Sequence, residues 1–447
     1  MRSPALPFGI PRLVLLHTAA LSAIASLATG CAVYHPKPLV AAVADIPSGE
    51  TLHSLKVDLR NGVNPDEAAV LAVLLNPTLR ADRDRHGLAV AQLIQAGVLP
   101  NPSVSFNRDY VIGGNTEGTI SAFGLGGSWD VTSLLTLAPK LAAARANLHS
   151  IDLDIAWTEW QTAQAARIAV YRVISLEAQL SAAHEADFAS GENVTSLQKA
   201  VELHNATALD LAAAQSASND ARMTALATGQ ELEKQRLELK RALGVPPGAD
   251  VRVEAQAMPS HLDLPSEKNL VGELESRRLD LLALKSGYDS QDATLRAAIL
   301  SQFPKISLGL NRATDTSNVQ TLGFGVSIDL PIFDRNQGAV ATENATRQKL
   351  FDEYASRVFQ ARADVAVALS DIRFLSRQIA ASGNAITDLQ NVVTMEKAAM
   401  DEGNADVLSY YQARNNLLSR KIELLKLKQQ LVETRIALEI AAGRLLP

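Results

Sequence analysis

Few residues of this chain have the types and spacing that catalysis or metal binding requires. The eight histidines are scattered, and no two of them lie at the spacing of metal ligands. No phosphate-binding loop and no recognisable arrangement of Ser, His and Asp is present. Gly323 and Gly325 alternate with apolar residues, as in a strand, whereas a nucleotide site places its glycines between a strand and a helix. We therefore expect no enzyme, no cofactor and no bound metal ion.

Cys31 is the residue whose position suggests covalent chemistry. It is the only cysteine, so it cannot form an intramolecular disulfide. It follows a leader, residues 1–30, in which Arg2 and Arg12 precede an apolar run of residues 13–27 that is short for a membrane helix. The small residues before Cys31 resemble the bacterial lipoprotein signal, which predicts a lipid (palmitate) on this cysteine. An ordinary leader with an incidental cysteine is the alternative.

Composition excludes one class of partner. The net charge is −6, and it becomes −8 once the leader, with its two arginines and no acidic residue, is removed. Because the chain has no basic patch, we do not expect it to bind nucleic acid. Aromatic residues make up only 4% of the chain, which suits close packing of helices.

The chain contains one structural unit twice. Matching residues lie 199 positions apart: Gly124, Gly126, Ser128, Asp130 and Gly244 in the first copy, and Gly323, Gly325, Ser327, Asp329 and Gly443 in the second. Each copy continues through a long run without proline, residues 140–245 and 332–446. Only very long helices need such runs, because an interior proline costs about 3 kcal/mol. We expect each copy to form a helix, two strands and a long helical hairpin.

The expected organisation follows from these repeats. An extended N-terminal strap covers residues 31–64, and a linker covers 249–265. Repeat 1 (65–248) holds strands within 102–131 and a hairpin at 139–244, and repeat 2 (266–447) holds strands within 304–330 and a hairpin at 337–443. Asn64 is the predicted N-cap of the first helix, with Pro65 at its first position.

The second hairpin carries a heptad pattern. Apolar residues follow each other at spacings of three and four from Phe351 to Met400, with Ser382 and Glu396 as the only polar members. This pattern predicts a coiled-coil seam of about seven heptads. A weaker second stripe (Val367, Phe374, Ala381) indicates that the helix contacts neighbours on two sides, as in a closed ring of helices.

The strands alternate between apolar and small or polar residues. Residues 103–108 align with 307–312, and the second strands are expected at about 119–131 and 320–330. Such alternation is typical of a transmembrane β-barrel, although a half-buried sheet in a soluble domain alternates in the same way. A barrel needs about eight strands, so four strands that cross a membrane must share one barrel with other chains.

These features together resemble the TolC-like outer-membrane efflux factors, including their lipid-anchored members. The shared motifs are residues 75–81, 97–102, 242–248, 329–333 and 403–408. The resemblance implies a mainly α fold with a membrane β-barrel: a homotrimer with a twelve-stranded barrel in outer-membrane lipid and a periplasmic α-barrel. It further implies a passive exit duct for heavy-metal cations or drugs, fed by a periplasmic membrane-fusion adaptor and an inner-membrane efflux pump. The alternative is a periplasmic coiled-coil adaptor or scaffold lipoprotein without a pore.

The resemblance also assigns the tips where the hairpins reverse. The second hairpin is expected to turn at residues 402–408, and the repeat places the first turn at 203–209, although residues 191–193 offer a rival turn. The candidates for adaptor contact are Gly403, Asn404 and Ala405 in one tip and His204, Asn205 and Ala206 in the other.

Acidic residues at these tips are the candidates for a gate. The resemblance maps a pore-lining acid onto Asp406, while the second lining position holds Ser409. Asp401, Glu402 and Asp210 are the further candidates. Three like charges brought together repel each other, so such a ring could bind cations or favour opening. Each of these residues could equally be a solvated charge or a cap at a helix end.

Neutralising Asp406 tests the gate directly. In a reconstituted channel, Asp406→Asn is expected to change single-channel conductance or block by divalent cations, because a ring of carboxylates is lost. Unchanged conductance and block would contradict the role.

Overall fold

The computed structural model describes residues 34–39, 61–114, 116–255, 258, 264–402 and 407–446. The chain divides into two units, residues 1–43 and 44–447. In the first unit, the described residues 34–39 are exposed and have no regular structure. The predicted leader, Cys31 and most of the strap lie outside the described residues. None of the described helices is both long enough and apolar enough to cross a membrane.

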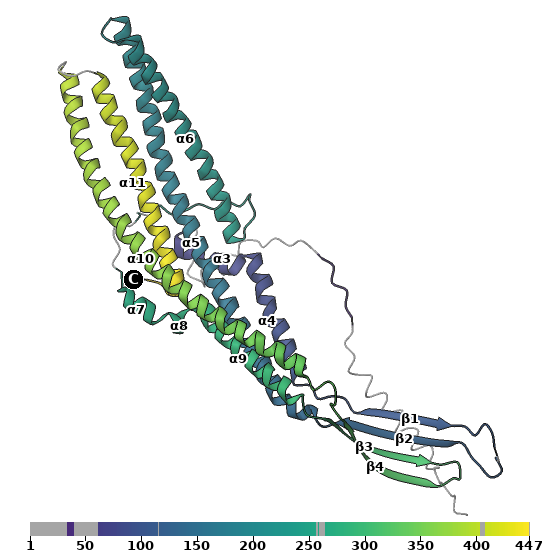
Figure 1. The fold of residues 1–447 in the computed structure, drawn as a ribbon. Coiled ribbons are helices and arrows are strands. Elements are labelled where there is room, and N and C mark those ends of the chain that lie inside the picture. The colour runs from purple at the N-terminus through teal and green to yellow at the C-terminus, as the bar shows by residue number, and fades with distance from the viewer. Residues whose placement is uncertain are drawn as a thin grey trace, which may run out of the picture. The chain divides into compact units, whose positions relative to one another are not determined.

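The second unit is mostly helical with a small antiparallel sheet, as the repeats predicted. Repeat 1 contains α3 (Pro65–Leu75), α4 (Pro77–Ala96), β1 (Ser103–Asp109), β2 (Ala122–Asp130), α5 (Ser133–Glu202) and α6 (Ala208–Leu243). Repeat 2 contains α7 (Glu267–Gly272), α8 (Leu274–Arg277), α9 (Leu279–Leu300), β3 (Lys305–Thr314), β4 (Gln320–Asp329), α10 (Gln337–Asp401) and α11 (Val407–Ala442). Within this unit, the long helices run side by side and the strands extend from one end of them (Figure 1).

The first helix begins where its sequence predicts. The Asn64 side chain accepts hydrogen bonds from the main-chain N–H groups of Asp66 and Glu67, and Glu67 accepts one from the N–H of Asn64. This capping box satisfies donors that would otherwise lack partners in the first turn. Asn76 then ends α3 and caps α4, with Pro77 at the first position of the new helix.

The first hairpin begins earlier than the expected residue 139. Helix α5 starts at Ser133 and includes Pro139. The corner before it is closed by short-range contacts: Asp130 Oδ1 accepts the N–H of Thr132, and the Ser133 hydroxyl donates to the Asp130 carbonyl. In repeat 2, Pro331 follows β4 and Asn336 adopts a left-handed conformation (φ 59°), so α10 starts only at Gln337.

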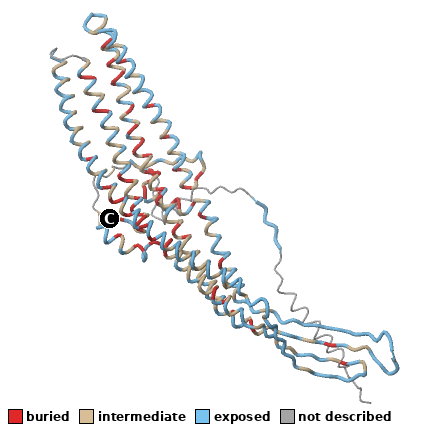
Figure 2. The backbone as a smooth tube through the Cα atoms, in the orientation of Figure 1, coloured by how far each residue is buried: buried red, intermediate tan, exposed pale blue. Residues whose placement is uncertain are grey.

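Each repeat has its own apolar core, and the two cores use matching residues. Pairs 199 positions apart are buried in both: Leu71 and Leu270, Leu75 and Leu274, Ala166 and Val365, Val173 and Ile372, Leu232 and Leu431, Leu239 and Leu438. In α10 the heptad seam is buried from Val358 to Ile379, with Leu375 half-buried, while Phe351 at its start is exposed. Figure 2 shows the buried residues along the helices and a sheet that is largely exposed.

The four strands form one sheet in the order β1-β2-β3-β4, and every neighbouring pair is antiparallel. The middle pair, β2 and β3, joins the two repeats. Equivalent registers recur, since Asn107 pairs with Gly124 in repeat 1 and Asn311 pairs with Gly323 in repeat 2. The duplication therefore extends to the pairing of individual residues.

A second repeated feature joins the short helices to the returning arm of each hairpin. The Asn76 side chain donates to the Ala242 carbonyl, and the Arg278 side chain donates to the Ala441 carbonyl, both at 3.3 Å. Gly244 and Gly443 end the returning helices in left-handed conformations, with φ 76° and 67°. A Cβ on Gly244 would lie 2.7 Å from the main chain of Asn76, and one on Gly443 would lie 3.1 Å from the Arg278 Cα.

Alanine at these two glycines tests the joint. Gly244→Ala and Gly443→Ala are each expected to destabilise the chain by about 1–3 kcal/mol, since alanine must take a left-handed backbone against a neighbouring main chain. Denaturant unfolding measures the loss. Gly248→Ala is the matched control, because no atom lies within 4 Å of its added Cβ and its φ is not positive. Equal stability of all three variants would contradict the role of the joint.

Candidate functional site

The sheet has two chemically different faces. One face carries small and polar residues, among them Ser105, Asn107, Gly126, Asn311 and Ser327, which the strand register places on the same side. The other face is apolar, and its side chains include Phe106, Leu125, Leu310, Phe324 and Val326. Alternation along each strand assigns the residues to these faces.

The apolar face has no covering layer in the described chain. Phe106 is 68% exposed, Leu322 80% and Phe324 68%, and the large apolar side chains beside them are exposed as well. A soluble sheet normally buries such a face against a second layer. An uncovered face of this kind marks a contact surface for lipid or protein.

The polar face is lined by close contacts that glycine permits. The amide oxygen of Asn107 lies so close to Gly124 that a Cβ on this residue would clash with it. The amide oxygen of Asn311 lies equally close to Gly323. The hydroxyls of Ser103 and Ser128 lie 2.7 Å apart across the same strand pair. The glycines that sequence reasoning placed on the small-residue face thus leave space for asparagine side chains.

The two outer strands have open edges. β1 pairs only with β2, and β4 pairs only with β3, among the residues that the structure describes. Each open edge presents main-chain N–H and C=O groups without a strand partner, which makes it a template for pairing with another chain.

The first hairpin reverses at the later of the two expected turns. Helix α5 runs through Gly191 and ends at Glu202, and α6 begins at Ala208. His204 adopts the left-handed conformation (φ 60°), and the N–H groups of His204 and Asn205 donate to the carbonyls of Val201 and Ala200. This is a Schellman turn, in which histidine stands where glycine is usual. His204 and Asn205 are exposed, and Ala206 is half-buried.

Asp210 forms hydrogen bonds within the first turn of α6. Its carboxylate accepts from the hydroxyl and the N–H of Thr207, and the Asp210 N–H donates back to the Thr207 hydroxyl. The hydroxyl hydrogen bond, and then the main-chain one, lower the pKa of Asp210 below its ordinary value. The residue therefore caps a helix, and a gating role for it stays a prediction.

Only part of the second tip is described. Asp401 is the last residue of α10, and Asp401 and Glu402 are both exposed. The candidates Gly403, Asn404, Ala405 and Asp406 lie outside the described residues, so their roles stay predictions.

The two hairpins meet along a polar seam between α5 and α11. From the core towards the tips, the side-chain pairs that cross it are Arg167 with Glu439, Arg172 with Glu433, Gln179 with Gln429, Glu192 with Arg414, and Ser196 with Tyr411. Within each repeat, by contrast, the helices pack through apolar clusters. Sequence reasoning missed this seam because its partners lie more than 200 positions apart.

Glu433 is a seam residue whose pKa is shifted. Burial raises its pKa, but hydrogen bonds from Arg172 and Gln429 outweigh burial, and the net pKa lies below the ordinary value of 4.5. The two bonds from Arg172 measure 2.8 and 3.1 Å. The folded state therefore favours the ionised carboxylate.

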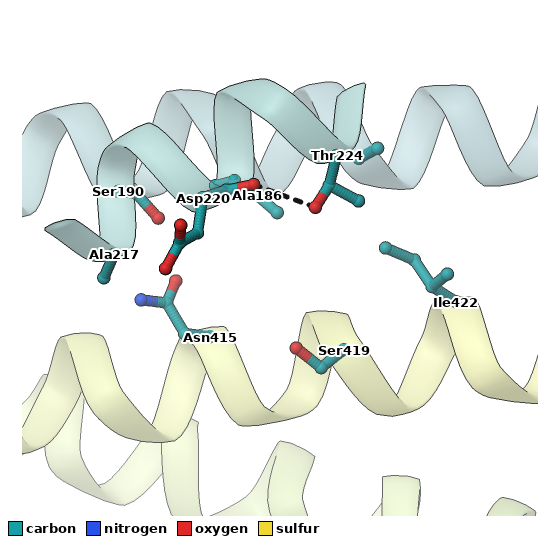
Figure 3. Close-up of a pocket in the computed structure, with 10 residues that line it drawn as sticks. Ala186, Ser190, Ala217, Asp220, Thr224, Asn415, Ser419 and Ile422 are labelled. Atoms are coloured by element: carbon teal, nitrogen blue, oxygen red, sulfur yellow. Dashed lines mark hydrogen bonds between the residues drawn. The ribbon is translucent and has the colours of Figure 1, made fainter. Parts of the chain in front are cut away.

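A cavity of about 290 Å³ lies beside the seam, between α5, α6 and α11 (Figure 3). Small and polar residues line it, and Asp220 and Asn415 point towards each other across it. The Asn415 Oδ1 atom is buried without a hydrogen-bond partner among the described residues. Among all the residues that the structure describes, no group of three or more His, Cys, Asp or Glu side chains could hold a metal ion.

The fold and these surfaces define a class of protein: paired helical hairpins that carry a small sheet with one uncovered apolar face. Two solved structures share this architecture. The chain resembles a solved structure of CusC with a TM-score of 0.68 and 20% identity, covering 93% of this chain and all of that one. It also resembles the outer membrane protein VceC from Vibrio cholerae, with a TM-score of 0.70, 18% identity and coverage of 86% and 97%.

The sequence comparisons agree with the fold. Residues 270–444 match the sequence model of the outer membrane efflux protein family. The cation efflux system protein CusC of Escherichia coli K12 is 26% identical over 177 residues, which cover 37% of this chain and 39% of the relative. The cobalt-zinc-cadmium resistance protein CzcC of Cupriavidus metallidurans is 26% identical over 209 residues, which cover 44% and 47%. The alignments thus span less than half of either relative.

Family match, relatives and fold together support an outer-membrane efflux factor of the TolC-like type. The resemblance that the motifs of both repeats indicated is confirmed, and so is the expected fold class.

Acid titration tests the seam. Glu433→Gln is expected to reduce stability at neutral pH by about 0.5–1 kcal/mol, a small value because the Arg172 side chain is partly exposed. Because the folded pKa is lowered, the wild-type contribution is present above pH 4.5 and is lost as the pH falls below it.

Denaturant unfolding between pH 7 and pH 3 is the measurement. The variant should lose less stability than the wild type over this range. Glu423→Gln, which removes an exposed ion pair with Arg420 on the same helix, is the control. Identical pH profiles for Glu433→Gln and the wild type would contradict the assignment.

Proposed function

We propose that this chain forms, as a homotrimer, the outer-membrane exit duct of a tripartite efflux system. The observation that carries the proposal is the sheet, which has one uncovered apolar face, one polar face and two open edges. Strands of 7 to 10 residues come close to the roughly 9–11 residues that cross a bilayer. Three copies supply twelve strands, enough for a barrel with lipid outside and a polar lumen.

The long hairpins support the same arrangement. Helix α10 carries an exposed apolar stripe formed by Phe359, Val367 and Phe374, on a different side from its buried seam. This stripe includes two members of the second stripe that the sequence placed against a neighbour. A ring of hairpins from three copies covers it and continues the duct into the periplasm.

The partners and cargo follow from the family and the relatives. The hairpin tips are the proposed contacts for a periplasmic membrane-fusion adaptor, through His204, Asn205 and Ala206 in one tip and Gly403, Asn404 and Ala405 in the other. The adaptor connects the duct to an inner-membrane pump. The duct conducts passively, and the pump supplies the energy. Heavy-metal cations are the favoured cargo because one relative is named a cation efflux system protein and the other a cobalt-zinc-cadmium resistance protein, and drugs are the second choice. Lipid on Cys31 anchors the mature chain to the outer membrane.

Two adjacent substitutions on β4 test this function. Val326 lies on the apolar face opposite Leu308, and Ser327 lies on the polar face opposite Ser307. Lysine on a lipid-facing strand position costs about 2–4 kcal/mol at the bilayer centre, whereas a lumen-facing lysine meets water. Val326→Lys is therefore expected to reduce the fraction of heat-sensitive trimer, and Ser327→Lys is expected to keep the trimer and alter its conductance.

The measurements are gel mobility with and without heating and conductance in planar bilayers. The wild-type chain is expected to form a heat-sensitive oligomer that conducts ions. A soluble chain that does not conduct would contradict the duct and favour the scaffold alternative. Equal losses from the two lysine variants would contradict the assignment of the faces.

A further inference from the structure

The apolar face of the sheet carries two charges, and both are arginines. Arg108 on β1 and Arg312 on β3 lie on this face by the register of the sheet. The other charged residues of the described strands, Asp109, Asp130, Lys305 and Asp329, lie on the polar face. Each arginine lies near the end of its strand that is remote from the helices.

The two arginines occupy equivalent positions in the two repeats. Residues 103–108 and 307–312 align without a gap, and each segment ends in Asn-Arg. The paired strands keep this equivalence, because Arg108 lies opposite Phe123 and Arg312 lies opposite Leu322. On its other side, Arg312 lies opposite Leu125.

Both guanidinium groups stand among apolar neighbours without an acidic partner. The Arg108 guanidinium lies 5.1 Å from the centre of the Tyr110 ring, and the Arg312 Nη2 donates to Gln320 at 2.9 Å. Neither group forms an ion pair among the residues that the structure describes, and both side chains are exposed. These contacts orient the two cations while leaving most of their donors available.

We propose that Arg108 and Arg312 bind the phosphate groups of lipid headgroups in the leaflet at the loop end of the sheet. The inference rests on the proposed function, since it requires the apolar face to lie in lipid. A long arginine side chain beside an apolar band extends its charge to the headgroup level. There its planar fork matches the oxygens of a phosphate, which a lysine would meet only as a point charge.

A lipid headgroup fits these residues better than free phosphate. Phe123, Leu125 and Leu322 surround the arginines and are 42%, 52% and 80% exposed. An acyl chain attached to the phosphate would cover this apolar surface, which a soluble anion would leave in water. The ligand is therefore an anionic, phosphate-bearing lipid.

The experiment measures the preference of the full chain for an anionic lipid. Wild-type protein is reconstituted in phosphatidylcholine, and the association of spin-labelled phosphatidic acid is compared with that of spin-labelled phosphatidylcholine. The double variant Arg108→Gln/Arg312→Gln is expected to lower the preference by on the order of tenfold. Lys305→Gln, which removes a positive charge from the polar face of the same sheet, is expected to keep it.

Two further measurements distinguish a lipid site from a site for soluble phosphate, and a planar guanidinium from a simple positive charge. Excess glycerol phosphate should leave the preference unchanged, and competition by it would show a site for soluble phosphate and overturn the proposal. Arg108→Lys/Arg312→Lys should restore only part of the preference.

Each sample is also assayed for heat-sensitive trimer and conductance. An unchanged preference in the glutamine variant that still conducts would overturn this inference and leave the duct intact. Failure of the wild-type chain to insert and conduct would contradict the duct and the lipid site together.

Discussion

Unpaired main-chain groups at the edges of a sheet are the constraint on which this structure depends. In hydrocarbon, every N–H and C=O must find a partner inside the protein, because no water is present to accept or donate. The described sheet leaves β1 and β4 without outer neighbours while exposing an apolar face suited to lipid. In a membrane, the apolar side chains of a single copy would contact lipid favourably, but the main-chain groups at its two sheet edges would lack hydrogen-bond partners. Pairing of β1 and β4 between copies would supply those partners.

Duplication explains how one chain supplies a symmetric share of such a barrel. The two apolar cores use matching residues, and in each repeat a side chain at the start of the helix before the strands, α4 or α9, bonds to the last turn of the returning arm. The joints are not identical, however. Arg278 in repeat 2 also forms a buried ion pair with Asp280 and lies over the Trp157 ring of repeat 1. Asn76, its counterpart in repeat 1, is uncharged and can form neither contact. The repeats thus share a backbone but differ in the contacts that connect them.

The contacts within a repeat differ in kind from the contacts between the repeats. Packed apolar clusters hold each hairpin to its own returning arm, whereas the two hairpins meet through ion pairs and amides, of which Glu439 and Gln179 are buried. Because leaving a buried charge such as that of Glu439 without its partner is costly, the polar seam also holds the two hairpins together. The cavity that Asn415 lines lies beside this seam, between α5, α6 and α11.

Much of the fold could be predicted from local patterns. The heptads of α10, the alternation in β3 and β4 and the cap at Asn64 each depend on neighbours within a few residues, and each was confirmed. The early start of α5 was missed because a proline at residue 139 usually marks a boundary, and here hydrogen bonds to Asp130 begin the helix before it. The left-handed His204 was unexpected because glycine is the usual residue there.

The candidate site was harder to predict because its contacts are distant in sequence. The faces of the sheet followed from alternation, but the pairing of β2 with β3 and the seam between α5 and α11 depend on the tertiary arrangement. The acidic candidates at the tips came from the family resemblance and the internal repeat, and of these Asp210, Asp401 and Glu402 lie among the described residues.

Amide hydrogen exchange in lipid nanodiscs tests most directly whether sister copies close the sheet. Half of the amides of β1 and β4 point away from their neighbouring strands, and in an isolated copy these amides face an open edge. If three copies share one barrel, the outward amides of both strands should be as well protected as those of β2 and β3. Rapid exchange along β1 and β4, with β2 and β3 protected, would show an open sheet and contradict a duct made of several copies.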